Sequence, residues 1–184
     1  PSEPTGGVSH AAHPDVDQIA FTGATEVGKL ISKAATGNLK KVSLELGGKS
    51  PNIVFSDADI DAAIAGAAQA IFFNQGEVCC AGTRLYVEQD RFDEVVEGVA
   101  RAAKNIKVGP GMEPDTEMGP LVSREQFERV TGYLAKGAQA GNRAMAGGHA
   151  IDGPSFFVEP TVLVATKPDH ALVRQASFAP GMVA

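Results

Sequence analysis

The hydrophobic residues in the first third of the chain recur at two spacings. Alternation of apolar and polar positions predicts three short strands, over residues 16–21, 41–46 and 52–55. Between the first two strands, the Thr22-Gly23 turn leads into a helix expected over residues 25–35, which Gly37 ends. A strand, a helix and a strand in this order predict a parallel α/β unit.

Helical spacing of three and four residues dominates the middle of the chain. The first apolar stripe follows Asp57 or Asp59, either of which can cap the helix, and consists of Ile60, Ile64, Ala67, Ala68, Ile71 and Phe72. A second stripe consists of Phe92, Val95, Val96, Val99, Ala103 and Ile106. A capping box of Ser123 and Gln126 opens a third helix, whose inward residues are Phe127, Val130 and Leu134.

Further strands are expected around these helices, over residues 84–88 and 156–164. Pro160 marks an edge or a bend in the second, and the turn-rich stretch 108–114 is expected to be a loop. The predicted fold class is therefore α/β, with parallel sheet units and flanking helices.

Composition excludes several classes of partner. The 184 residues are 43% hydrophobic and 21% charged, enough to bury the core of one domain or two small ones. The net charge is −6 with Lys and Arg scattered, which predicts no nucleic-acid partner and no anionic membrane surface. Apolar runs stay below the roughly 20 residues of a membrane span, and the N-terminus has no signal-peptide pattern. A cytoplasmic protein is expected.

The two cysteines, Cys79 and Cys80, are neighbours and cannot form a disulfide framework. Reduced thiols suit the cytosol. The four histidines show no metal-ligand spacing with Cys or acidic residues, so no metal site is expected.

Two polar residues stand where chemistry can occur. Glu45 ends an apolar, strand-like run, and Cys79 lies in a Gly-flanked turn that can expose its sulfur and its N–H. A base and a thiol together can perform acyl transfer through a thioester. The alternatives are a surface Glu at the start of a Gly-Gly turn and a buried, inert Cys. The apolar strand before Glu45 favours its burial, which would raise the pKa of the carboxyl group.

The turn between the first strand and helix is a second candidate site. Free backbone N–H groups and the positive end of a helix dipole near Thr25 can hold an anion such as a pyrophosphate. The alternative is an ordinary strand-to-helix turn.

Three segments in this order, residues 21–28, 42–51 and 74–82, closely resemble signature stretches of the NAD(P)-dependent aldehyde dehydrogenase superfamily. The sequence of these segments is most similar to that of bacterial members that act on phenylacetaldehyde or betaine aldehyde. The resemblance implies an aldehyde-dehydrogenase-like fold and an oxidoreductase that oxidises an aldehyde to a carboxylic acid. Cys79 would form a thiohemiacetal and then a thioester, with Glu45 as the general base. Cys80 matches a variable neighbour and is expected to be a buried, inert cysteine.

The resemblance also implies a cofactor, NAD or NADP, and the residues that contact it: Gly23, Ala24, Thr25, Gly28, Leu46, Gly47 and Phe178. Two positions depart from the family. Ala24 stands where Ser is common, and Ala176 stands where a Glu binds the nicotinamide ribose, two residues before Phe178.

Family members are more than twice as long, and the chain opens at Pro1 without Met, so a central fragment is expected. Residues 1–46 would be the C-terminal part of a Rossmann-like NAD(P)-binding domain, and residues 47–184 the N-terminal part of the catalytic, thiol-bearing domain. The expected partners are a small aldehyde and further copies of the chain in a homo-oligomer. Two alternatives stay open: cofactor-independent, esterase-like acyl transfer by the same pair, and a truncated or degenerate member that binds no cofactor.

Overall fold

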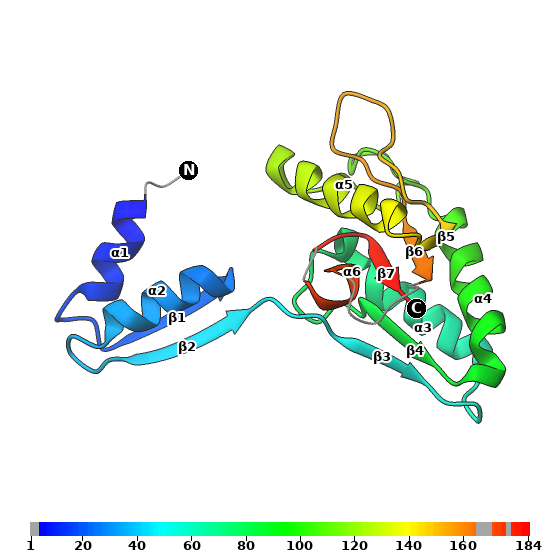
Figure 1. The fold of residues 1–184 in the computed structure, drawn as a ribbon. Coiled ribbons are helices and arrows are strands. Elements are labelled where there is room, and N and C mark those ends of the chain that lie inside the picture. Colours follow the sequence, from blue (N-terminus) through cyan, green and yellow to red (C-terminus); the bar gives the residue numbers. More distant parts are fainter. Residues whose placement is uncertain (1–3, 165–170, 176–177) are drawn as a thin grey trace. The chain divides into compact units, whose positions relative to one another are not determined.

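The computed structural model describes residues 4–164, 171–175 and 178–184. The chain folds as two compact units, Pro1–Gly47 and Gly48–Ala184, and each is described by itself (Figure 1). No helix in the described ranges is both long enough and apolar enough to cross a lipid bilayer.

The first unit is a parallel α/β unit, as the pattern predicts. It consists of α1 (Pro4–Ala12), β1 (Gln18–Gly23), α2 (Thr25–Ala35) and β2 (Lys41–Leu46). The two strands pair in parallel from Gln18 with Lys41 to Gly23 with Leu46. The bounds of α2 and β2 are those expected, whereas β1 begins and ends two residues later. Helix α1 was not expected because Pro and Gly are poor helix formers.

The second unit is built on a five-stranded sheet. Its strands are β3 (Pro51–Val54), β4 (Arg84–Val87), β5 (Arg143–Ala146), β6 (Thr161–Val164) and β7 (Gly181–Val183). Their order is β3-β4-β7-β6-β5, and all neighbours are parallel except β5, which is antiparallel to β6. The helices are α3 (Ile60–Phe72), η1 (Phe73–Gly76), η2 (Gln89–Arg91), α4 (Phe92–Asn105), α5 (Arg124–Gln139) and α6 (Ala171–Arg174). The mixed α/β class with parallel strands is confirmed.

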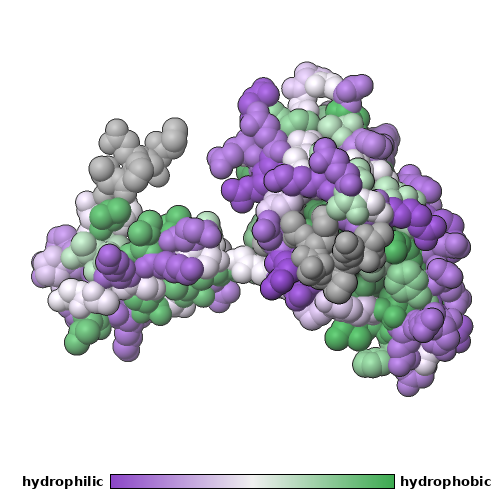
Figure 2. Space-filling model, viewed as in Figure 1, coloured by the Kyte–Doolittle hydropathy of each residue, from purple (hydrophilic) through white to green (hydrophobic). Residues whose placement is uncertain are grey.

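One face of the β3–β4 pair carries exposed apolar side chains. Ile53 pairs with Tyr86 in the register, and these residues are 57% and 47% exposed. Phe55, directly after β3, is 59% exposed. Figure 2 shows hydrophobic colouring on the surface around these strands.

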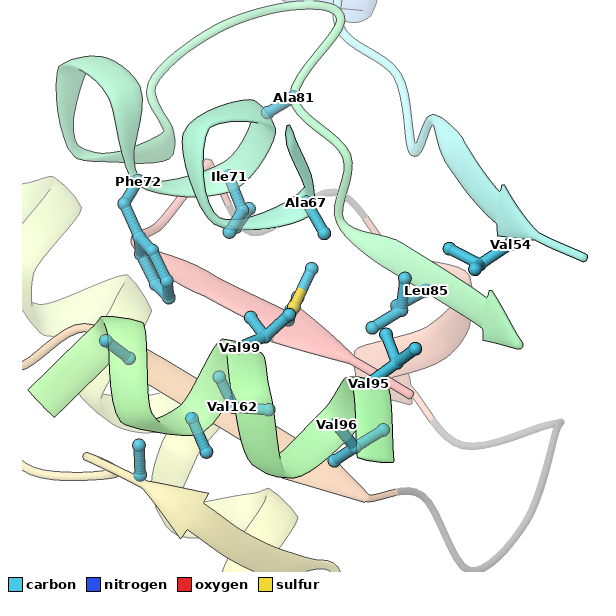
Figure 3. Close-up of a cluster of buried hydrophobic side chains, with 14 residues drawn as sticks. Val54, Ala67, Ile71, Phe72, Ala81, Leu85, Val95, Val96, Val99 and Val162 are labelled. Atoms are coloured by element: carbon cyan, nitrogen blue, oxygen red, sulfur yellow. The ribbon is translucent and has the colours of Figure 1, made fainter. Parts of the chain in front are cut away.

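The main core lies where α3 and α4 pack on the sheet. Figure 3 shows side chains of α3 and α4 pointing toward one another and toward β4 and β6. The fully buried members of this cluster include Ile71, Leu85, Val95, Val99 and Val162. They belong to the two predicted helical stripes and to the two strands predicted around them, so the hydrophobic pattern identifies this core.

Polar caps fix where two of the helices begin. Asp59, and not Asp57, caps α3 by accepting a hydrogen bond from the Ala62 N–H at 3.1 Å. Ser123 caps α5 by accepting from the Gln126 N–H at 3.1 Å. Each cap satisfies a first-turn N–H group that the helix itself leaves unpaired.

The strand expected over residues 156–164 is shorter than predicted. Only Thr161–Val164 is a strand, and Val158 makes an isolated bridge with Ala150. Pro160 has no N–H to give to a ladder, so β6 starts after it. Strands β5 and β7 were not predicted.

Candidate active site

Cys79 lies on a turn between α3 and β4. After α3, the backbone of Asn74, Gln75 and Gly76 takes three consecutive left-handed conformations, with φ of 47°, 56° and 69°. The following turn is closed by the Ala81 N–H, which donates to the Val78 carbonyl at 3.2 Å. Left-handed backbone costs a non-glycine residue roughly 1–2 kcal/mol, so the surroundings of this run must stabilise it.

Both thiols on this turn are exposed and free. The expected exposure of the Cys79 sulfur is thus present, and within the described ranges its N–H makes no backbone hydrogen bond. The expectation that Cys80 is a buried residue is wrong, because the turn carries both side chains at the surface. Because both thiols are exposed, exposure alone does not indicate which of them is the nucleophile.

Two segments, residues 48–50 and 79–83, meet at the amino ends of the parallel strands β3 and β4, beside Val183 at the carboxyl end of β7. The Arg84 N–H donates to the Ser50 carbonyl at 3.2 Å, and the Val183 N–H donates to the Thr83 carbonyl at 3.0 Å. A Cβ added to Gly48 would lie 3.4 Å from the Cys79 carbonyl oxygen, so these two segments are in contact. Parallel strands present their amino ends on one edge, which explains why segments far apart in the chain converge here.

This edge is the less usual place for a site, since open α/β sheets bind ligands mostly at the carboxyl ends of their strands. The assignment of this edge therefore depends on its side chains and not on the general rule.

Two cations, Lys49 and Arg84, lie at the amino ends of β3 and β4. The Arg84 guanidinium donates to the Lys49 carbonyl, and within the described part of the chain its buried Nε has no hydrogen-bond partner. Burial, and to a lesser degree the charge of Arg84, lower the pKa of the Lys49 ammonium group from 10.5 to about 8.

Glu77 carries a negative charge on the Cys79 turn. Its Oε1 accepts a hydrogen bond from the Val122 N–H at 3.3 Å. Partial burial raises the pKa of this carboxyl group, and the hydrogen bond from Val122 opposes that rise. No sequence pattern assigns a role to this residue, which the structure connects to the loop before α5.

Glu45 lies on β2 of the first unit, where it pairs with Thr22 in the register. The expectation that it is buried is wrong, because its side chain is exposed in this unit. Alternation along β2 turns Leu44 and Leu46 to the half-buried face and Glu45 to the other face. Within the described residues, β1 is the only strand beside β2 and no helix of the unit covers that second face.

Most of the expected cofactor residues gather at the carboxyl end of β1 and β2. Gly23 and Leu46 are register partners, Ala24 is the N-cap of α2, and Thr25 is its first residue. A Cβ at Gly28 would lie 2.8 Å from Leu46 Cδ2, so the glycine allows α2 to pack closely on β2. Helix α2 thus begins beside the strand ends.

The start of α2 suits an anion. Gly23 and Ala24 are exposed, and in this unit Ala24 offers its helix no side-chain cap. The first N–H groups of a helix carry partial positive charge and bind phosphate when no cap occupies them. The exposed, uncapped turn fits the pyrophosphate of a dinucleotide.

Phe178 belongs to the second unit. The other six expected cofactor residues belong to the first unit: Gly23, Ala24, Thr25, Gly28, Leu46 and Gly47. It has a left-handed φ of 49°, and its carbonyl accepts a hydrogen bond from Gln126 Nε2. Ala176, the departure from the family pattern, lies outside the described residues.

Sequence reasoning missed the residues that support the Cys79 turn. Gln75 Nε2 donates to the Pro120 carbonyl at 3.2 Å, and a Cβ at Gly76 would lie 2.0 Å from the Ala179 carbonyl oxygen. The available signal was the Asn-Gln-Gly run, since Asn and Gly tolerate left-handed backbone.

Comparison with known proteins identifies the class to which this fold and turn belong. The model of the aldehyde dehydrogenase family matches residues 2–183. The chain belongs to the aldehyde dehydrogenase family.

Individual relatives agree with this assignment. The chain is 47% identical to the mitochondrial aldehyde dehydrogenase of Mesocricetus auratus over 97% of its own length and 36% of the relative. It is 44% identical to retinal dehydrogenase 2 of Mus musculus, covering 96% of this chain and 34% of that one. The NAD+ complex of an aldehyde dehydrogenase from Bacillus cereus matches with a TM-score of 0.91 and 44% identity, over 94% of this chain and 35% of the other. The chain thus spans about a third of the length of its relatives.

Proposed function

We propose that this chain supplies the nucleophile and the general base of an enzyme that oxidises an aldehyde to a carboxylic acid with NAD or NADP. The single observation that carries the proposal is Cys79, exposed on a turn whose sequence matches the family signature. The name of the Bacillus cereus relative, an aldehyde dehydrogenase in complex with NAD+, supports the cofactor.

Cys79 is proposed to attack the aldehyde carbon through its sulfur. The resulting oxyanion would accept a hydrogen bond from the Cys79 N–H, which makes no backbone hydrogen bond within the described segments. NAD or NADP, when bound by the residues named below, would supply the hydride acceptor for this oxidation.

Glu45 is proposed to take a proton from the water that hydrolyses the Cys79 thioester. Chain connectivity alone limits the Cα of Glu45 to about 11 Å from that of Gly48, whatever the arrangement of the two units. Since Gly48 contacts the Cys79 turn, the covalent chain is compatible with this role.

The cofactor is proposed to bind through the turn at Gly23, Ala24 and Thr25, with its phosphates on the first N–H groups of α2. Gly28 supports that turn, and Leu46, Gly47 and Phe178 are proposed to contact the nicotinamide half. The domain assignment follows: residues 1–46 as part of the NAD(P)-binding domain and 47–184 as part of the catalytic domain. A cytoplasmic location and a homo-oligomer complete the proposal.

The test is NADH formation from a series of aldehydes by the longest native protein that contains this sequence. Cys79→Ser should lower turnover at least about 10³-fold, because the serine hydroxyl group is a far weaker nucleophile than the cysteine thiol. Glu45→Gln should lower it about 10²- to 10⁴-fold while single-turnover thioester formation continues. Cys80→Ser is the matched control and should retain activity. Undiminished turnover in Cys79→Ser refutes the proposal.

A second candidate is a degenerate family member that binds no dinucleotide. Ala176 in place of the ribose-binding Glu favours it. Calorimetric titration with NAD separates the two, because micromolar binding rejects the degenerate member and no binding supports it. Hydrolysis of an activated ester without nucleotide, abolished by Cys79→Ser, would instead indicate esterase-like acyl transfer.

A further inference from the structure

The left-handed run at Asn74, Gln75 and Gly76 determines the direction in which the chain enters the Cys79 turn. Two of these three residues are not glycine, so their backbone conformation is intrinsically unfavourable. Unfavourable conformations persist only where surrounding contacts impose them, and they concentrate at functional sites. The contacts around this run therefore indicate what holds the turn.

One side chain of the run, Gln75, and the side chain directly after the run, Glu77, bind to the same backbone segment. Gln75 Nε2 donates to the Pro120 carbonyl at 3.2 Å, and Glu77 Oε1 accepts from the Val122 N–H at 3.3 Å. A Cβ added to Gly119 would lie 3.0 Å from Gln75 Nε2, so this glycine lets the amide group approach the segment. Gln75 donates one of these hydrogen bonds and Glu77 accepts the other, and together they fix the register of the turn against residues 120–122.

The segment that receives these bonds is itself anchored. Leu121, between the two bonded residues, is 3% exposed, and its N–H donates to the Phe156 carbonyl at 3.0 Å. Leu121 and Ala179 belong to the same buried cluster. Gly76 lies against the backbone of Ala179, so the run also contacts this cluster.

We propose that Gln75 and Glu77 are positioning residues that hold the Cys79 turn against the 120–122 segment. The inference rests on the proposed role of Cys79 as nucleophile, which needs its sulfur in one orientation. Neither residue acts on a substrate. The two hydrogen bonds make the neighbouring thiols unequal, because they fix which side chain the turn presents most openly.

The test compares the two thiols in the same molecule. The chain is alkylated with iodoacetamide, and mass spectrometry gives separate rate constants for Cys79 and Cys80 over a range of pH. In the wild-type chain Cys79 should react faster at every pH. Gln75→Ala should bring the ratio of the two rates about fivefold closer to one, as expected when one hydrogen bond no longer selects a conformation. Gln139→Ala, at the exposed end of α5, is the matched control and should leave the ratio unchanged.

A pair of variants at the second bond keeps the test decisive if Gln75→Ala fails to fold. Glu77→Gln retains an oxygen that can accept from the Val122 N–H and should preserve the ratio, whereas Glu77→Ala should bring it closer to one. Equal rates at both thiols in the wild-type chain overturn the proposal. So does a ratio that Glu77→Ala leaves unchanged, or that Glu77→Gln changes equally. Alkylation needs neither aldehyde nor dinucleotide, so its result is independent of whether the proposed oxidation occurs.

Discussion

Lys49 keeps an ammonium group in surroundings that disfavour its charge. The side chain is largely buried, and Arg84 adds a second positive charge nearby, so the pKa of Lys49 is lowered to about 8. In the unfolded chain the amine would have its ordinary pKa of 10.5. As pH falls between these two values, the unfolded chain takes up a proton that the folded chain does not, and folding becomes less favourable.

Lys49→Met should remove this loss of folding stability. The variant is expected to have a higher Tm than the wild type below about pH 8, and the difference should shrink as pH rises toward about 10. Thermal unfolding at a series of pH values measures it. Lys104→Met, on the exposed face of α4, is the control and should show a smaller change with pH. A difference in Tm that stays constant over this range would show that the low pKa of Lys49 is wrong.

At the level of single residues, the sequence predicted local features better than the environment that distant residues create. The exposed Cys79 followed from its Gly-flanked turn, which is a local feature. The support by Gln75 could not be predicted, because its hydrogen-bond partner is 45 residues away. Glu45 was expected to be buried from its apolar neighbours, but burial depends on what covers the other face of β2, and no local pattern contains that information.

Among the helices and strands, those whose own residues carry a clear hydrophobic period were predicted best. Helix α5 has an apolar stripe, a cap at Ser123 and 16 residues. Strand β2 has clear alternation, and its bounds match the expectation. Strand β7 has three residues, too few for periodicity to be visible, and β5, whose sequence is RAMA, has no β-branched or aromatic residue. They are strands because β6 lies between them and pairs with both.

The cap of α5 can be tested by itself. Ser123→Ala removes the oxygen that accepts from the Gln126 N–H and should lower the free energy of unfolding of the second unit by about 1 kcal/mol. Ser123→Thr keeps a hydroxyl oxygen and should lose only part of that. Urea unfolding followed by circular dichroism provides the comparison. If the Ala and Thr variants unfold at the same urea concentration, the hydroxyl is not the source of the stability.

At the scale of the whole molecule, an apolar surface on an edge strand favours association. In the described sheet, β3 is the last strand on its side, and Ile53, Phe55 and Tyr86 are exposed beside it. An uncovered strand edge with apolar neighbours pairs readily with other chains.

We expect the chain to self-associate with increasing concentration, and Ile53→Lys to reduce this by placing a charge on the apolar face. Size-exclusion chromatography with light scattering measures the mass in solution. Met112→Lys, at a loop residue 95% exposed, makes the same kind of change elsewhere and should leave the association intact. Equal masses for the two variants at every concentration would exclude this face as the contact.

The order of the strands also determines how the second unit can be assembled on the ribosome. Strand β7 is the last of the five to be synthesised, yet it is inserted between β4 and β6. Until it emerges, the β3–β4 pair and the β5–β6 pair have no strand to join them, and each leaves an unpaired edge. Translation that pauses before residue 181 would therefore leave a nascent chain in two open halves, a natural substrate for chaperones.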